Sequence, residues 1–201
     1  MHIGVDFDNT IVNYNEVFYK YAFKKGLVTP EIKKEKHHIR EAIWKLPNGN
    51  DLWTMLQGSV YGVNILEAKP MYGVKKFFKA CQEESISISI VSHKTKYPEK
   101  GPTIDLRKAS LAWLAKKGFF SELGLHESRV FFTNSIEEKI AKIKEIHCTH
   151  FIDDLLFVLM HKSFPRDVAK ILYTKAPDQA IRSDMQHFTK WPEISAYFFE
   201  K

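Results

Sequence analysis

Short apolar segments alternate with amphipathic segments over most of the chain. Residues 2–7 form a run with little polar content, which is typical of a strand covered on both faces of a sheet. Further short apolar segments predict four more strands, at residues 85–91, 129–132, 149–152 and 168–174. Helical spacing of apolar residues predicts helices at residues 73–84, 104–117, 135–146, 155–161 and 192–199. This alternation predicts an α/β fold, with a parallel sheet of about five strands flanked by helices.

Residues 14–68 differ from the rest because they carry helical patterns and no predicted strand. Aromatic residues at helical spacing, the helix start Thr29-Pro30 and the capping residue Asp51 predict helices at residues 14–26, 30–46 and 51–62. We therefore expect an inserted helical unit within a sheet domain. The expected boundaries are residues 1–13 and 69–201 for the sheet domain and residues 14–68 for the insertion.

Length and composition are typical of one main globular domain. The 201 residues, 44% of them hydrophobic, can bury one full core and a modest insertion. No apolar run approaches the ~20 residues of a membrane span, and Asp6 precedes any signal-peptide core. The two cysteines, Cys81 and Cys148, have neither the number nor the spacing of a disulfide framework or a zinc site. We expect a soluble protein of the reducing cytoplasm, with no membrane partner.

The chain is basic, with a formal net charge of +6 and a pI of about 9.1. Such a charge favours anionic partners. Because the lysines are spread along the chain, a phosphorylated small molecule explains the charge as well as nucleic acid does, and we do not expect a nucleic-acid partner. No pattern in the sequence indicates an oligomeric state.

The first predicted strand ends in two acidic residues, Asp6 and Asp8, and Thr10 follows two positions later. Ligands of open parallel sheets bind outside the carboxyl ends of the strands, where a loop can bring both carboxylates around one small volume. Two close carboxylates repel each other unless a cation joins them, and Mg²⁺ prefers carboxylate oxygens together with substrate phosphate. The alternative is structural, with the Asp side chains capping the next backbone turn.

The second predicted strand is followed by a hydroxyl and a basic loop. Ser92 leads into His93, Lys94 and Lys96, whose hydroxyl, amide and ammonium groups suit a phosphate. The basic character continues to Arg107, so the loop at residues 93–107 could contact a second anionic group of a substrate. The alternative is a polar loop with solvated lysines.

A second acidic pair, Asp153 and Asp154, follows the fourth predicted strand, where Asp154 could instead cap the next helix. The helix that starts near residue 135 carries several lysines, and Lys139 lies closest to its N-terminal end. A lysine near the sheet edge would neutralise a carboxylate and a phosphate. We choose Lys139 for this position, with Lys142 second, although a solvated helix face also explains these lysines.

These residues, in this order, resemble a known family. The segment DFDNT, Ser92, Lys139 and the pair Asp153-Asp154 are similar to the four motifs of the haloacid dehalogenase superfamily. The resemblance covers essentially the whole chain, and the first motif is specific. It implies a Rossmann-like parallel sheet, in which residues 14–68 form a small helical cap between the first and second motifs.

The resemblance implies a role for each acid of the first motif. Asp6 would be the nucleophile that attacks phosphorus and forms an aspartyl-phosphate. Asp8 would protonate the leaving alcohol and then activate water. An aspartate at position 8 is similar to the phosphatase and phosphomutase branches, whereas the carbon–halogen branch lacks it, so dehalogenation is disfavoured.

The resemblance also implies a Mg²⁺ cofactor. The metal would be held by Asp6, by the main-chain carbonyl of Asp8 and by Asp153. Asp154 would support it directly or through water.

A phosphate site is implied beside the metal. Ser92 and the adjacent amide of His93 would bind phosphate oxygens, and Lys139 would offset the negative charge. Asn9 would donate its backbone N–H to the phosphate, and Thr10 would fix the loop through its hydroxyl.

The leading hypothesis is a magnesium-dependent phosphatase that hydrolyses a small phosphomonoester, such as a nucleotide or a sugar phosphate. A phosphotransferase or phosphomutase would use the same residues, with a substrate hydroxyl in place of water. A non-catalytic phospho-ligand binding protein is a third interpretation, which the loss of the nucleophile or of the acid would indicate. Both Asp6 and Asp8 are present.

Overall fold

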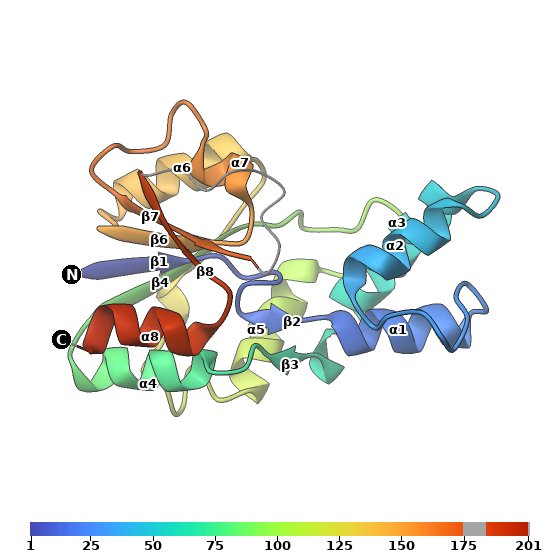
Figure 1. The fold of residues 1–201 in the computed structure, drawn as a ribbon, viewed down its shortest axis with the longest axis horizontal. Helices are drawn as coiled ribbons and strands as arrows, with labels where there is room; N and C mark the ends of the chain where they lie inside the picture. Colours follow the sequence, from blue (N-terminus) through green and yellow to red (C-terminus); the bar gives the residue numbers. More distant parts are fainter. Residues whose placement is uncertain (175–183, 201) are drawn as a thin grey trace. The chain divides into compact units, whose positions relative to one another are not determined.

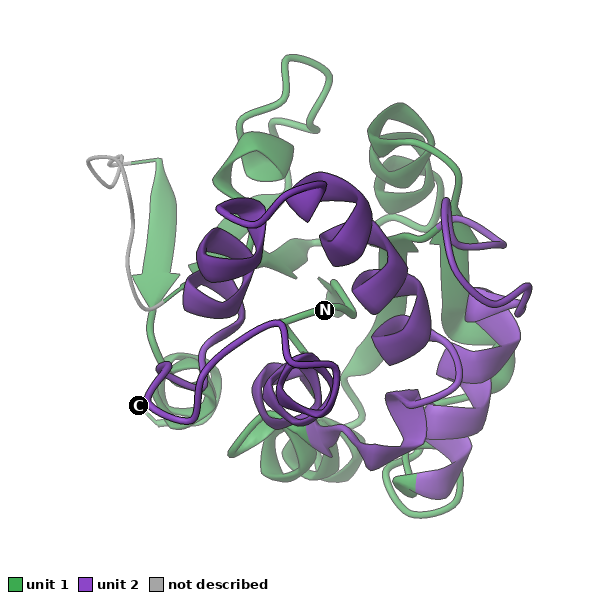
Figure 2. Cartoon of the chain, turned by 90° about the vertical axis from the view of Figure 1, so that its right-hand side faces the viewer, with its two compact units in different colours: residues 1–12, 70–94, 117–201 green, residues 13–69, 95–116 purple. Residues whose placement is uncertain are grey.

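The computed structural model describes residues 1–174 and 184–200. The chain forms two compact units, which Figure 2 distinguishes by colour. Unit 1 consists of Met1–Val12, Pro70–Lys94 and Lys117–Lys201, and unit 2 consists of Asn13–Lys69 and Thr95–Lys116. Unit 2 thus contains the segment Thr95–Lys116 in addition to the insertion expected from the sequence. No helix in the described ranges is long and apolar enough to cross a membrane.

Unit 1 is built on a sheet that has six strands within the described residues, in the order β5-β4-β1-β6-β7-β8 (Figure 1). All neighbouring strands run parallel. The strands are β1 His2–Val5, β4 Ser87–His93, β5 Val130–Thr133, β6 His150–Asp153, β7 Ala169–Tyr173 and β8 Met185–Phe188. The predicted α/β parallel sheet is confirmed, and the predicted number of about five strands is too low by one.

The strand that the pattern missed, β8, lies at the edge of the sheet. It has four residues, and its second residue, Gln186, is exposed. An edge strand needs no continuous apolar run because one side faces solvent. Its pairing with β7, which matches Ile171 to Gln186, therefore left no clear signal in the sequence.

β1 lies inside the sheet, between β4 and β6, and is covered on both faces. Its Ile3 and Val5 are wholly buried. A side chain at Gly4 would place its Cβ 2.5 Å from the ring of Phe151 and 2.8 Å from the sulfur of Cys148, so only glycine fits there. The apolar composition of residues 3–5 follows from this central position.

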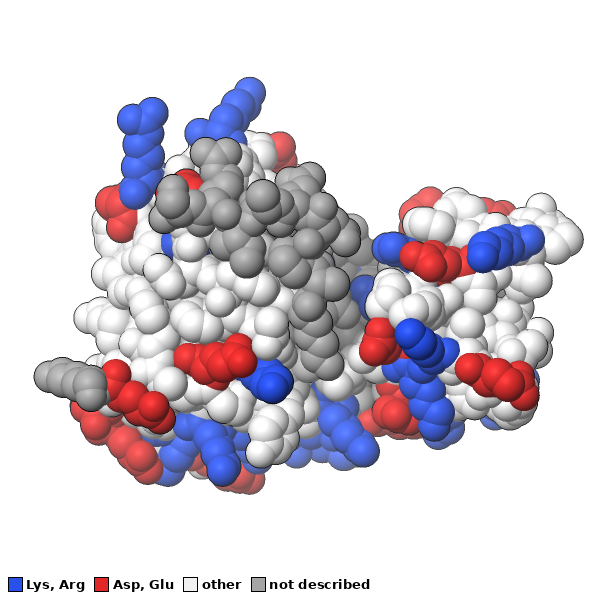
Figure 3. Space-filling view, in the orientation of Figure 1, with Lys and Arg blue, Asp and Glu red and all other residues white. Residues whose placement is uncertain are grey.

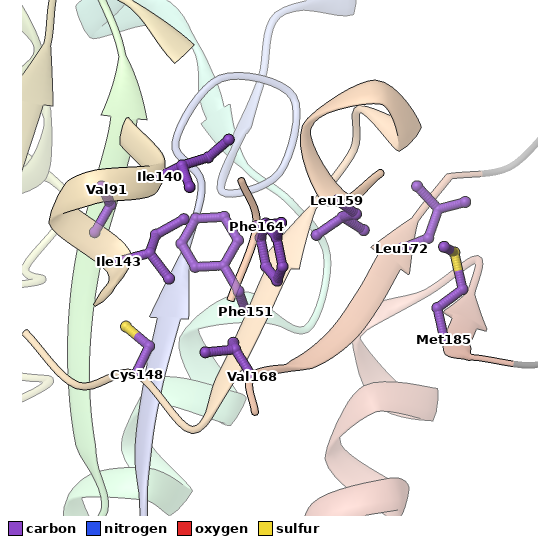
Figure 4. Close-up of a cluster of buried hydrophobic side chains, with 10 residues drawn as sticks. All are labelled: Val91, Ile140, Ile143, Cys148, Phe151, Leu159, Phe164, Val168, Leu172 and Met185. Atoms are coloured by element: carbon purple, nitrogen blue, oxygen red, sulfur yellow. The ribbon is translucent and has the colours of Figure 1, made fainter. Parts of the chain in front are cut away.

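Helices cover both faces of the sheet in unit 1. Figure 1 shows α6 and α7 on one face and α4 and α8 on the other. Their bounds are α4 Val74–Glu83, α6 Ile136–Glu145, α7 Leu156–Leu159 and α8 Trp191–Phe199, with a short 3₁₀ helix, η2, at Glu127–Arg129. Side chains of α6, α7 and the sheet meet in the apolar cluster of Figure 4, which comprises Val91, Ile140, Ile143, Cys148, Phe151, Leu159, Phe164, Val168, Leu172 and Met185.

Unit 2 is helical within the described residues. It contains α1 Asn15–Lys24, α2 Lys36–Trp44, α3 Gly49–Tyr61, the 3₁₀ helix η1 Ile65–Glu67 and α5 Leu106–Lys116. Phe18 stacks on Trp53 with ring centroids 4.8 Å apart, so these aromatics form core. The buried indole of Trp113, on α5, donates to the carbonyl oxygen of Ala68 at 2.9 Å. This contact joins Thr95–Lys116 to the helical insertion, and local sequence patterns do not encode it.

Two predicted helix starts in unit 2 are wrong. The second helix begins at Lys36 rather than Pro30, because its buried anchors are Ile39 and Ile43 and residues 30–35 form turns and bends. The third helix begins at Gly49, two residues before the predicted cap Asp51. Where the chain passes between the units, β2 Val12–Asn13 and β3 Lys69–Pro70 pair with each other.

Candidate active site

The loop after β1 is a hydrogen-bonded turn that presents the first acidic pair. The backbone N–H groups of Ile11 and Val12 both donate to the carbonyl oxygen of Phe7, at 3.0 and 3.1 Å. Asn9 has a φ of 62°, a left-handed conformation that Asn adopts more readily than most residues. The carbonyl oxygen of Thr10 accepts a 2.9 Å hydrogen bond from the indole of Trp191. The turn is therefore fixed both by its own backbone and by α8.

Asp6 is buried beyond the end of β1, and its carboxylate is held in one orientation. Its Oδ1 accepts hydrogen bonds from Lys139 Nζ at 2.6 Å and from Ser92 Oγ at 2.9 Å. The hydroxyl of Thr10 lies 3.4 Å from Oδ2, which is a long contact. The structure thus brings together four of the residues that the sequence analysis assigned to the site.

Lys139 joins the first and last motifs. Its Nζ lies 2.6 Å from Asp6 Oδ1 and 2.6 Å from Asp153 Oδ2, and its side chain is 1% exposed. Burial alone would lower the pKa of Lys139, but the carboxylates of Asp153 and Asp6 outweigh it and raise the pKa above its ordinary value. Lys139 therefore carries a permanent positive charge between two acids.

The helix start explains why Lys139 reaches inward. The Ser135 hydroxyl caps α6 by accepting from the N–H of Glu138 at 3.1 Å, so Lys139 follows directly in the first turns at the sheet edge. Lys142, the second choice, is three residues further along and forms a surface ion pair with Glu145 at 2.6 Å. The geometry favours Lys139 over Lys142.

The acidic pair after β6 completes a cluster of carboxylates. Asp153 accepts the N–H of Leu155 at 2.9 Å, and Asp154 lies 3.4 Å from the hydroxyl of Thr10. One oxygen from each of Asp6, Asp153 and Asp154 lies within 4.8 Å of the others. Burial, with the negative charge of Asp6, raises the pKa of Asp153 to about 6 even though Lys139 opposes the shift. The alternative role of Asp154 does not fit, because Leu155 precedes α7 as its N-cap.

This donor set fits a hard divalent cation. Among the described residues, the acids of the site are Asp6, Asp8, Asp153 and Asp154, and the lysines paired with them are Lys94 and Lys139. Counted as carboxylates and ammonium groups, the four acids exceed the two lysines by two negative charges. Carboxylate oxygens are ligands that Mg²⁺ prefers, and one such ion would balance the excess.

Asp8 has a partner that the sequence analysis did not assign. Lys94 Nζ lies 2.7 Å from Asp8 Oδ2 and 3.0 Å from Oδ1. The Lys94 side chain is 3% exposed, and its backbone N–H donates to Thr133 at 3.0 Å. The sequence contained a signal for it, because residues two apart at a strand end share a face and Lys94 follows Ser92 by two.

The side chain of His93, another predicted phosphate-binding residue, turns away from the carboxylates. His93, between Ser92 and Lys94, is exposed, and its ring nitrogen lies 3.1 Å from the carbonyl oxygen of Asn134. Strand alternation turns it away from its two neighbours. Lys96 is exposed in unit 2, with its Nζ 5.4 Å from the ring of Tyr97. Roles for the His93 amide, the Asn9 amide and Lys96 stay predictions.

A second group of possible metal ligands lies in unit 2. The acceptor atoms of Glu35, His37 and His38 lie within 4.8 Å of one another, and two of these residues are exposed. The surrounding sequence, KKEKHHIR, is rich in lysine and arginine, and the group lies at the positive N-terminal end of α2. Both features disfavour a cation at this group.

Comparisons with known proteins establish the fold. No model of a protein family matches the sequence, and no curated protein matches it. Among solved structures, a HAD-superfamily hydrolase of subfamily IA from Geobacter sulfurreducens has a TM-score of 0.59 at 12% identity, over 96% of this chain and 93% of that chain. The HAD-hydrolase YfnB from Bacillus subtilis, bound to magnesium, has a TM-score of 0.59 at 10% identity, over 100% and 98%.

A HAD family hydrolase from Deinococcus radiodurans R1, with bound phosphate and sodium, has a TM-score of 0.58 at 10% identity, over 99% of this chain and 95% of that chain. The likeness extends over nearly the full length of each structure. The chain therefore has the fold of the haloacid dehalogenase superfamily, as its motifs predict.

Proposed function

We propose that this chain is a magnesium-dependent phosphatase that hydrolyses a small phosphomonoester through an aspartyl-phosphate. The observation that carries the proposal is the buried Asp6 carboxylate, which Lys139 and Ser92 hold beside Asp153 and Asp154. Bound magnesium and bound phosphate in structures that share the fold support it. The expected cytoplasmic location belongs to the same proposal.

Asp6 would act as the nucleophile. Lys139 and Ser92 both donate to the same oxygen of Asp6, Oδ1. These hydrogen bonds fix the orientation of the carboxylate before a substrate binds. The carboxylate attacks phosphorus and forms an aspartyl-phosphate while the bond to the leaving alcohol breaks, and water then cleaves this intermediate. The preorganised positive charge of Lys139 stabilises the negative charge that accumulates around phosphorus.

Asp8 would supply the proton transfers. It lies two residues beyond the nucleophile, and its side chain is 21% exposed, so it remains accessible to a substrate. In the first step its carboxyl group gives a proton to the leaving alkoxide, and in the second its carboxylate takes a proton from the attacking water.

Magnesium would be held by Asp6, the main-chain carbonyl of Asp8, Asp153 and Asp154. When bound, it would polarise the phosphoryl oxygens and offset their charge. Lys139 prearranges two of these acids, because its ammonium group contacts both Asp6 and Asp153.

The positive charge of unit 2 supports the proposal of an anionic substrate. It contains 14 Lys and Arg residues against 8 Asp and Glu residues, and therefore accounts for the whole net charge of +6. Such a charge raises the local concentration of anions such as phosphomonoesters.

The testing experiment measures phosphate release from a panel of nucleotides, sugar phosphates and simple alkyl phosphates, with magnesium and with chelator. Wild type should release phosphate only with magnesium, and Asp6→Asn should be inactive while it remains folded. Asp51→Asn is the matched control, because Asp51 is an exposed acid on α3 that pairs with Lys100. Release that persists in Asp6→Asn would refute the nucleophile, and no release by wild type from any compound would refute the function.

A further inference from the structure

One buried cation of the site has no task in the mechanism above. The Lys94 side chain is 3% exposed, and its Nζ lies 2.7 and 3.0 Å from the two carboxylate oxygens of Asp8. The ammonium group is also 5.5 Å from the ring centroid of Phe7, the residue that separates the two acids of the first motif. Burying a lysine ammonium group costs free energy unless the group is paired. The pair with Asp8 is therefore what makes the burial of Lys94 possible.

The two buried lysines serve different acids. Lys139 contacts Asp6 and Asp153, which would attack phosphorus and hold the metal. Lys94 contacts Asp8, which would move protons at the leaving group. A contribution of Lys94 should therefore depend on whether the leaving group needs a proton.

The main chain of Lys94 is held by the sheet, whereas Asp8 lies on a turn. Lys94 directly follows β4, and its N–H donates to the carbonyl oxygen of Thr133, which ends the neighbouring strand β5. The Asp8 side chain is 21% exposed. Contact of one ammonium group with both of its carboxylate oxygens restricts the rotation of that side chain.

We propose that Lys94 is a positioning residue that holds the carboxyl group of Asp8 beside the oxygen of the leaving group. This inference rests on the proposed phosphatase function. Lys94 keeps its protons throughout, whereas Asp8 gives one to the leaving alkoxide and later takes one from water. Proton transfer requires a donor and acceptor about 2.6–3.2 Å apart, and a misplacement of about 1 Å costs on the order of 10²-fold in rate.

The test compares leaving groups. An alkyl phosphate needs its leaving oxygen protonated, whereas the nitrophenolate of p-nitrophenyl phosphate departs as a stable anion. The single-turnover rate of leaving-group release isolates the first step from the later attack of water. Lys94→Met should lower this rate on the order of 10²-fold for the alkyl phosphate and much less for p-nitrophenyl phosphate. The KM for the alkyl phosphate should change little.

Two further variants complete the design. Lys94→Arg keeps a cation that can contact both carboxylate oxygens and should restore much of the alkyl phosphate rate. Lys75→Met is the matched control, because Lys75 forms an exposed ion pair with Glu122 on the same unit, and its rates should equal those of wild type. Circular dichroism at the assay temperature confirms that each variant is folded.

Equal losses of Lys94→Met on both substrates would overturn the inference, because Lys94 would then act on the phosphoryl group or on the fold. Wild-type rates on both substrates would also overturn it. Either result leaves the phosphatase function intact, since wild type is active in both cases. An inactive wild type would instead refute the proposed function.

Discussion

At the scale of single residues, the site is a set of buried charges that compensate one another. Lys139 contacts both Asp6 and Asp153 at 2.6 Å, and Lys94 contacts Asp8 at 2.7 Å. None of these groups could be buried alone at low cost, because an unpaired charge loses its hydration without replacement. The consequences of removing each charge are therefore specific and measurable.

Asp8→Asn should reduce steady-state turnover of an alkyl phosphate about 10²- to 10⁴-fold, the usual contribution of a positioned acid and base. The amide keeps the size of the side chain and deletes proton transfer. Turnover of Asp51→Asn, measured in the same assay, should match wild type because that residue lies on the surface of α3. An Asp8→Asn rate within a few-fold of wild type would contradict the assigned role.

Lys139→Met should destabilise the protein by about 3–5 kcal/mol, because Asp6 and Asp153 remain buried without their shared cation. Lys142→Met, three residues along the same helix, removes a partly exposed ion pair with Glu145 and a contact with the ring of Phe131, and should cost about 0–1 kcal/mol. Urea unfolding of both variants in chelator measures the difference. Similar losses for the two lysines would show that Lys139 is not the buried partner of the acids.

The protonation of Asp153 should make stability depend on pH in the absence of metal. Burial raises the folded-state pKa of Asp153 from 3.8 to about 6, so the folded protein holds this proton more tightly than the unfolded chain does. The stabilisation that comes from binding this proton is fully present below pH 3.8 and is lost as the pH rises through about 6. Asp153→Asn has no carboxyl group at this position, so its stability does not change with pH for this reason.

Relative to wild type, Asp153→Asn should therefore gain stability between pH 4 and pH 7. Chemical unfolding at a series of pH values, with chelator present, gives this difference. A difference that is constant over the range would show that the pKa of Asp153 is not raised in the folded protein.

At the scale of elements, the loop after β1 depends on a helix from the other end of the chain. The indole of Trp191, at the start of α8, donates to the carbonyl oxygen of Thr10 at 2.9 Å, and both residues are wholly buried. Thr10 in turn lies 3.4 Å from both Asp6 and Asp154. The geometry of the acids is thus coupled to the docking of α8.

Trp191→Phe should lower stability by about 1–3 kcal/mol, because it leaves a buried carbonyl without its donor, and should also lower kcat. Trp113→Phe is a chemically matched control, since the Trp113 indole is equally buried and donates at 2.9 Å to Ala68 in unit 2. Its stability loss should be similar and its loss of kcat smaller. Equal losses of kcat would argue against a role for Trp191 in fixing the loop.

The alternation of side chains along β4 shows how well the pattern of a single strand predicts which residues face the site. Ser92 and Lys94 both point to the first motif, whereas His93 contacts Asn134. A two-residue alternation continued one step beyond the strand separates these residues correctly. Helix starts were less predictable, because α2 begins only at Lys36, where its apolar side chains find a core.

At the scale of the whole molecule, the net charge of +6 lies in unit 2, because Lys and Arg equal Asp and Glu in number in unit 1. On the face shown in Figure 3, Lys and Arg side chains alternate with Asp and Glu side chains. Nucleic-acid binding usually needs a continuous basic stripe, which the mixed charges of this face do not form.

Magnesium should stabilise the folded protein, because it binds the carboxylate cluster of the folded state and not the unfolded chain. At a concentration of about 100 times its Kd the ion adds about 2.7 kcal/mol to the free energy of unfolding. The Tm should rise with added magnesium and fall with chelator. Asp153→Asn should abolish the response, and a Tm that is insensitive to magnesium in wild type would contradict the metal site.

The sequence by itself determined the class of fold and the order of the chemical groups. Apolar runs as short as residues 2–7 are readable because a central strand is buried on both faces. Asp6, Ser92, Lys139 and Asp153 could be chosen because a parallel sheet gathers the residues that follow its strands along one edge.

Only the tertiary structure decided the rest. The pairing of Lys94 with Asp8, the bridge of Lys139 and the support of Thr10 by Trp191 join residues between 14 and 181 positions apart. The edge strand β8 and the docking of α5 by Trp113 likewise depend on distant partners. Local patterns report which face of an element is buried, whereas the identity of the partner emerges only when the whole chain packs.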